Sequence, residues 1–146
     1  MWLVSACLLG VRCRFDGCAV MDETVVELAD GGGAVPVCPE QLGGFSTPRL
    51  RSEFRGGDGR AVLDGRARVV AEDGADVTES FERGAQETLA IARRCGATRA
   101  VFKERSPSCG VTQVWVDGRL AGGMGVTAAL LVREGIEVAS SEDPGT

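Results

Sequence analysis

Arg99-Ala-Val-Phe-Lys-Glu-Arg-Ser-Pro-Ser-Cys-Gly110 decides how the chain can fold, because a short apolar run leads directly into a stiff loop that carries a thiol. Residues 99–102 predict a buried strand. Pro107 lacks an N–H group and biases Ser106 towards extended backbone, while Gly110 permits a sharp turn or a close approach. Cys109 is therefore expected beyond the carboxyl end of a strand, where ligands bind in open α/β sheets.

Strands and helices are expected to alternate on both sides of this segment. This alternation predicts an α/β fold: a single domain over residues 1–146, with a parallel-rich sheet and helices on both faces. Pro36 places its strand at an edge or in irregular pairing, because proline cannot donate to a sheet. The expected strands are 3–6, 34–37, 99–102 and 136–139, and the expected helices are 24–29, 76–95 and 126–134.

The segment between Gly56 and Gly74 interrupts this alternation. Its apolar runs at 61–63 and 67–70 flank Asp64-Gly65, which predicts a β-hairpin insertion without chemistry of its own. A second small ribbon is expected at 114–120. Residues 45–53 are expected to form an ordered loop that carries positive charge.

Composition excludes several classes of function. The chain has 146 residues, a formal net charge of −5, no histidine and no tyrosine. The negative charge argues against general nucleic-acid binding, and no apolar run is long enough to cross a membrane. The first residues lack the pattern of a signal peptide, so we expect none, and we expect a cytoplasmic protein. Without histidine, acid–base chemistry falls to carboxylates, lysine, serine or metal-bound water.

Three of the six cysteines share one sequence context. Cys7, Cys38 and Cys109 each follow an expected strand, so parallel neighbours would bring them to one rim. In a reducing compartment such thiols favour an iron–sulfur cluster or a zinc site over disulfides, although zinc sites usually show close Cys-x-x-Cys pairs. The alternative is small buried hydrophobes, which we prefer for Cys95 and, less decidedly, for Cys18.

Five motifs extend this pattern over essentially the whole chain. They are Ser5-Ala-Cys-Leu-Leu-Gly10, Cys13-Arg-Phe-Asp-Gly17, Val37-Cys-Pro-Glu-Gln-Leu-Gly-Gly44, Lys103-Glu-Arg-Ser-Pro-Ser-Cys-Gly110 and Gly125-Val-Thr-Ala128. In this order they resemble the motifs of the thiouracil desulfurase family. Phe15 stands where that family often has tyrosine, which bears on the substrate and not on the cluster.

The resemblance implies a [4Fe–4S] cluster held by Cys7, Cys38 and Cys109, with one open iron. Cys13 matches a family motif too, but we place it near the cluster rather than on it. It implies non-redox, iron–sulfur-dependent desulfuration of a thiolated pyrimidine such as 2-thiouracil, which releases sulfide and gives uracil. The implied partners are a small thiolated base or nucleoside and the iron–sulfur assembly machinery. A non-catalytic [4Fe–4S] sulfide-binding or sulfur-carrier protein is the alternative, and a zinc-stabilised interaction module is the third possibility.

Carboxylates and hydroxyls near these cysteines are the candidates for catalysis. Glu40 lies two residues after Cys38 and is the expected general base, although it could also cap a helix start. Ser106 is expected to orient substrate or water. Asp16 and Ser108 are candidates for substrate binding, with turn and loop structure as their alternatives. Lys103 and Glu104 could form a structural ion pair.

Overall fold

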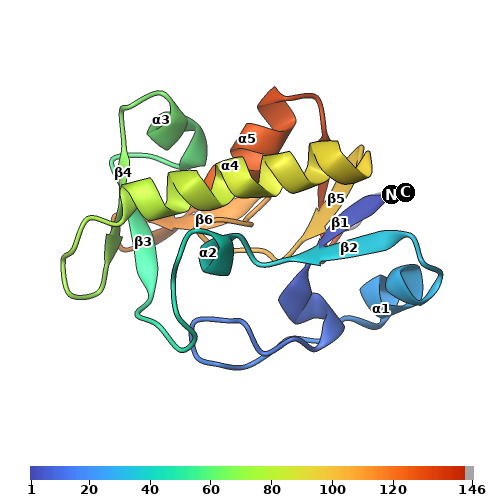
Figure 1. Cartoon of the computed structure of the whole chain (residues 1–146). Coiled ribbons are helices and arrows are strands. Elements are labelled where there is room, and N and C mark those ends of the chain that lie inside the picture. The colour runs from blue at the N-terminus through green and yellow to red at the C-terminus, as the bar shows by residue number, and fades with distance from the viewer. Residues whose placement is uncertain (144–146) are drawn as a thin grey trace.

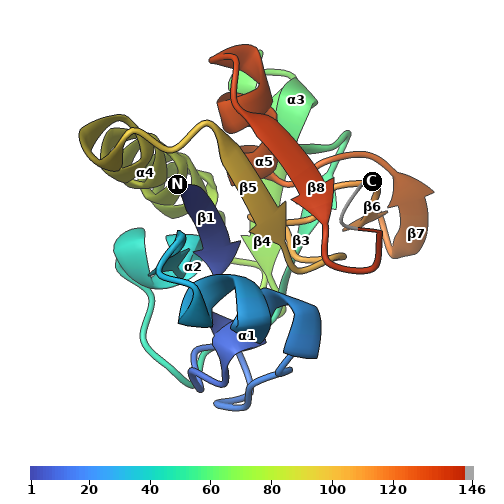
Figure 2. The ribbon, with the colours of Figure 1, turned by 90° about the vertical axis from the view of Figure 1, so that its right-hand side faces the viewer.

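A wholly parallel four-stranded sheet forms one half of the computed structural model, which describes residues 1–143. In spatial order its strands are β2 (Ala34–Val37), β1 (Trp2–Ser5), β5 (Arg99–Phe102) and β8 (Glu137–Ser140). The arrows of β1, β5 and β8 run side by side in Figure 2. All four strands were expected, and β2, which contains Pro36, lies at the edge as predicted.

Helices cover both faces of this sheet (Figure 1). They are η1 (Ala6–Leu9), α1 (Glu23–Asp30), α4 (Thr78–Cys95) and α5 (Val126–Arg133). Leu3 of β1 packs in the larger core cluster with residues of α4 and α5, and Val4 packs in a second cluster with residues of η1 and α1. Side chains alternate across a strand, so one strand serves both clusters. The single α/β domain with helices on both faces is confirmed.

A second four-stranded sheet corrects two details of the sequence analysis. Its strands, in spatial order, are β4 (Arg68–Ala71), β3 (Ser52–Arg55), β6 (Gln113–Val116) and β7 (Arg119–Gly122). The β6–β7 pair is the expected ribbon, and β3 and β4 pair in antiparallel fashion. The hairpin's first strand is therefore β3, at the end of the segment for which only a loop was expected.

The run 61–63 is helical, contrary to the prediction of a strand. It belongs to α3 (Gly59–Leu63), which begins where the Asp58 carboxylate accepts the N–H of Ala61 at 3.3 Å. A capped turn buries Ala61 and Val62 as well as a strand would. Three apolar residues are too few to distinguish the two periodicities, which explains the error.

A further short helix, α2 (Pro39–Leu42), follows directly after β2. It packs closely against α4, where Gly84 permits the contact: a Cβ atom there would lie 2.1 Å from the carbonyl oxygen of Pro39. Only glycine at position 84 of α4 therefore lets α2 pack this closely against α4. Among residues 1–143, no helix is long and apolar enough to span a membrane.

Candidate functional site

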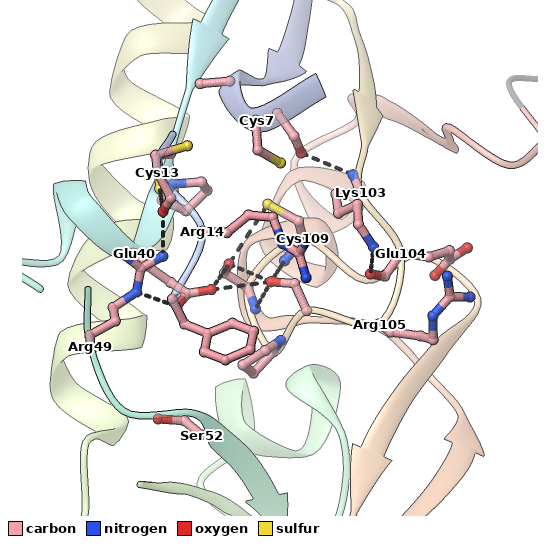
Figure 3. Close-up of a pocket in the computed structure, with 18 of the residues that line it drawn as sticks. Cys7, Cys13, Arg14, Glu40, Arg49, Ser52, Lys103, Glu104, Arg105 and Cys109 are labelled. Carbon is pink, nitrogen blue, oxygen red and sulfur yellow. Dashed lines mark hydrogen bonds and ion pairs between the residues drawn. The ribbon is translucent and has the colours of Figure 1, made fainter. Parts of the chain in front are cut away.

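A cavity of about 300 Å³ lies beyond the carboxyl ends of β1, β2 and β5. Four cysteines line it, namely Cys7, Cys13, Cys38 and Cys109. Cys7 sits in η1 directly after β1, Cys38 links β2 to α2, and Cys109 lies in the loop after β5. Sulfur atoms of Cys7 and Cys109 point towards each other in Figure 3. The sheet thus brings together the three thiols that the sequence placed at strand ends.

Burial and mutual contacts raise the pKa of most of these thiols. Burial raises the pKa of the Cys109 thiol to about 12. A hydrogen bond with the Cys13 side chain, together with burial, raises the pKa of Cys38. A hydrogen bond with Cys13 lowers the pKa of Cys7 instead. Metal ligands must be thiolates, so loading this site must release protons.

The thiols around the cavity are donors that both iron–sulfur clusters and zinc sites use. Within residues 1–143, no three Cys, Asp or Glu side chains converge closely enough to hold a single metal ion. In number and kind, the four cysteines that line the cavity match the ligands of an iron–sulfur cluster.

The remaining cysteines lie away from the cavity. Cys95 ends α4 and packs, partly buried, against the main core, in agreement with a hydrophobic role. Cys18 is exposed, so a buried hydrophobic role is wrong for it. Neither residue lines the cavity.

Glu40 stands in the first turn of α2 and faces two hydroxyl groups. Its Oε2 atom accepts from Ser106 Oγ at 3.3 Å and from Ser108 Oγ at 3.1 Å. Its Oε1 atom accepts from Arg49 Nε at 2.9 Å. The side chain of Glu40 is 16% exposed and all three partners line the same cavity. The carboxylate that the sequence singled out is therefore held from two sides beside the thiols.

The Ser106–Cys109 loop is braced by its own hydroxyl and by helix α5. Ser106 Oγ accepts the N–H groups of Ser108 and Cys109, both at 3.1 Å. The N–H groups at the start of α5 donate to the carbonyls of Pro107 and Ser108. A Cβ atom at Gly125 would lie 2.4 Å from Ser108, so the glycine-rich turn before α5 packs closely against this loop.

Asp16 lies outside the residues that line the cavity. Its exposed carboxylate accepts the N–H of Cys18 at 3.0 Å, and this bond lowers the pKa of Asp16. This contact corresponds to the turn role that was the alternative for Asp16. Ser108, the other candidate for substrate binding, does line the cavity.

Glu104 is a structural acceptor and forms no ion pair with Lys103. Its buried carboxylate accepts the N–H groups of Val111 and Thr112 at 2.8 Å and 3.0 Å, and the Thr112 hydroxyl at 2.7 Å. Lys103 Nζ donates instead to the Glu104 carbonyl at 3.2 Å. Although burial opposes ionisation, these hydrogen bonds hold the pKa of Glu104 at about 2.

Replacing Glu104 with glutamine is expected to destabilise the fold by about 2–4 kcal/mol, because several bonds to a buried charge are lost and the new amide meets donors. The folded-state pKa lies below its ordinary value of 4.5. The carboxylate therefore contributes its full stability above about pH 4.5, and loses it as the pH falls towards 2. Urea unfolding of Glu104→Gln against wild type at several pH values measures this. The exposed Glu137→Gln variant is the control, and equal stability of wild type and Glu104→Gln at pH 7 would contradict the prediction.

Sequence reasoning missed the basic side chains and Trp115 in the cavity wall, and it noted Phe15 only as a departure from the family motif. Arg49 is the most buried of these, with a side chain that is 6% exposed. The remaining members that line the cavity are Arg14, Phe15, Arg51, Arg105 and Trp115. The positive charge of the 45–53 segment was the available signal. It did not reveal that Arg49 turns inward.

Comparison with known proteins supplies an independent line of information. The family profile described as 2-thiouracil desulfurase matches residues 2–143. Uncharacterized protein YbbK of Bacillus subtilis (strain 168) is 45% identical over 146 residues, which cover 98% of this chain and 97% of that protein. A solved structure described as [4Fe-4S]-dependent thiouracil desulfidase TudS aligns with a TM-score of 0.83 and 39% identity, over 96% of this chain and 89% of the other.

Proposed function

Because this chain belongs to the 2-thiouracil desulfurase family, we propose that it removes sulfur from a thiolated pyrimidine such as 2-thiouracil, releasing sulfide and giving uracil. One observation carries the proposal: Glu40, Ser106 and a set of strand-end thiols line the same cavity. The reaction exchanges C=S for C=O at the expense of one water molecule. It requires no net electrons and is therefore non-redox.

The cofactor in this proposal is a [4Fe–4S] cluster, on which the TudS protein depends. Cys7, Cys38 and Cys109 would hold it, in keeping with the family motifs. With only three thiolate ligands, one iron would stay open and would supply a Lewis acid for the substrate's sulfur. In the cell, iron–sulfur assembly machinery would load the site.

Glu40 is the general base in this proposal. Its carboxylate would take the proton of the water that attacks the thiocarbonyl carbon, a task for which the chain has no histidine. Ser106 and Ser108 hold Oε2, so the carboxylate stays directed at their side of the cavity. Fixed groups of this kind favour the transition state because they need little reorganisation during the reaction.

Turnover without any electron donor is the direct test. The chain is loaded anaerobically with iron and sulfide, supplied with 2-thiouracil and other thiolated bases and nucleosides, and assayed for sulfide and the oxygenated product. Repeated turnover without reductant supports the proposal. Sulfide bound in a fixed ratio without product favours a sulfur carrier, and activity only with a reductant contradicts the hydrolytic mechanism.

Ser106→Ala is expected to lower turnover by about tenfold, since one neutral hydrogen bond contributes about 1 kcal/mol. The N–H groups of Ser108 and Cys109 also lose their acceptor, so we expect a loss of about 1–2 kcal/mol in unfolding free energy. Steady-state kinetics and urea unfolding measure the two effects. Ser141→Ala, outside the cavity lining, is the control, and unchanged kinetics in Ser106→Ala would remove Ser106 from the mechanism.

A further inference from the structure

The side chain of Arg49 donates more hydrogen bonds at the cavity wall than an ion pair with Glu40 alone would require. Its Nε donates to Glu40 Oε1 at 2.9 Å, and its Nη2 donates to the carbonyl of Cys13 at 2.7 Å. Its Nη1 donates to Thr47 Oγ1 at 2.9 Å and to the Ser46 carbonyl at 3.2 Å. Figure 3 shows the guanidinium beside Glu40 and Cys13. Every nitrogen of the group is thus engaged.

The backbone of Arg49 is fixed at the same place. Its N–H donates to the carbonyl of Phe15 at 2.8 Å, so main chain and side chain both bind the 13–15 segment. The guanidinium therefore cannot swing away from Glu40 without breaking bonds to other parts of the wall. A planar fork held this way restricts the carboxylate far more than a flexible ammonium group does.

The two oxygens of Glu40 are consequently divided between two sets of donors. Arg49 engages Oε1, and the hydroxyls of Ser106 and Ser108 engage Oε2. Without the guanidinium, rotation about the terminal torsion of Glu40 would be opposed only by the two serines. We propose that Arg49 is the positioning residue of the reaction, and that it holds the Glu40 carboxylate in the orientation in which Oε2 meets the serines and the reacting water.

The expected effect of Arg49 on kcat rests on the proposed function. The expected effect of Arg49 on the position of the Glu40 carboxylate does not. Misplacing a reacting group by about 1 Å can lower a rate by about 100-fold. We therefore expect Arg49→Lys and Arg49→Gln to lower kcat by about 10–100-fold, with KM within about threefold and iron content unchanged. Lysine retains the charge but cannot reach Glu40 Oε1 and the Cys13 carbonyl together, so it should restore activity only in part.

A double-mutant cycle separates positioning from general support of the fold. If Arg49 acts through Glu40, adding Arg49→Gln to Glu40→Gln should change kcat by less than about twofold. Independent losses that multiply would overturn the proposal. Arg93→Gln, which breaks an exposed ion pair of 3.2 Å with Glu134, is the matched control and should leave kcat unchanged.

Crystal structures of the metal-free Arg49 variants provide the second readout. The proposal requires that the Glu40 carboxylate leave its place beside Ser108 Oγ, and an unmoved carboxylate overturns it. Should the wild type be inactive on every thiolated pyrimidine, the proposed function fails, and this structural result still decides the role of Arg49. If Arg49→Gln does not fold, Arg49→Lys takes its place; if neither folds, Arg49 serves the fold and the proposal is wrong.

Discussion

Glu40→Gln is expected to lower the turnover of 2-thiouracil by ~10²–10⁴-fold, the range that a positioned proton acceptor typically contributes. Glutamine matches glutamate in size, and its one amide oxygen can still accept from Arg49 while its NH2 group faces the serine hydroxyls, but it cannot take a proton from water. Substrate binding and bound iron should therefore stay near wild type, and the loss should appear in kcat.

The measurement is steady-state sulfide release by cluster-loaded protein, with iron determined on the same sample. Glu134→Gln is the control, because its carboxylate pairs only with the exposed Arg93 and lies outside the cavity lining. Normal turnover by Glu40→Gln would mean that the base lies elsewhere. Glu104 is then a poor substitute, because its carboxylate is already occupied by the 111–112 segment.

Cys7→Ser, Cys38→Ser and Cys109→Ser are each expected to lose most of the bound iron, and turnover with it. Each change removes one of only three proposed thiolates, and serine is a poor ligand for iron in such a cluster. Iron and acid-labile sulfide per chain after anaerobic reconstitution measure the effect. Cys18→Ser and Cys95→Ser should keep a full complement, and iron loss in these variants with retention in Cys38→Ser would refute the assignment.

Cys13→Ser is the decisive member of this series. Four thiols line the cavity, and the Cys13 carbonyl lies 3.7 Å from Cys38 Sγ, so geometry alone does not single out three ligands. Our assignment places Cys13 beside the cluster rather than on it, and it therefore predicts that Cys13→Ser keeps its cluster. If all four variants lost iron equally, four thiolates would saturate the cluster, no iron would stay open, and the desulfurase mechanism would fail with it.

The parallel sheet could be predicted from the sequence because its signal is local. Each strand is a short apolar run between helical segments. Cys7 and Cys38 come just after two of these runs, and Cys109 lies in the loop beyond a third. Strand adjacency then brings the thiols together without any need to know side-chain packing. Glu40 could be predicted for the same reason, since it lies two positions after Cys38.

The rest of the site depends on contacts between distant parts of the chain. Arg49 donates a hydrogen bond to the carbonyl of Cys13, a residue 36 positions earlier in the sequence. The residues around either position do not indicate this contact. An ion pair between Glu104 and Lys103 was expected, but the carboxylate of Glu104 instead accepts hydrogen bonds from the N–H groups of residues 111–112. These buried N–H groups need an acceptor, and neighbouring residues in the sequence do not reveal that need. The helix at 59–63 was missed because a single capping carboxylate decided it.

The hydrogen bonds that the Ser106 hydroxyl already makes restrict the groups of a ligand that it can bind. Two backbone N–H groups already occupy the acceptor capacity of its hydroxyl oxygen, so only its single hydrogen remains to be directed. That hydrogen has Glu40 Oε2 and Ser108 Oγ as acceptors. Ser106 can therefore meet a bound molecule only as a donor, and it must then withdraw this hydrogen from Glu40 and Ser108. In the proposed reaction a ring carbonyl, thiocarbonyl or unprotonated ring nitrogen would satisfy it, whereas a ring N–H would not.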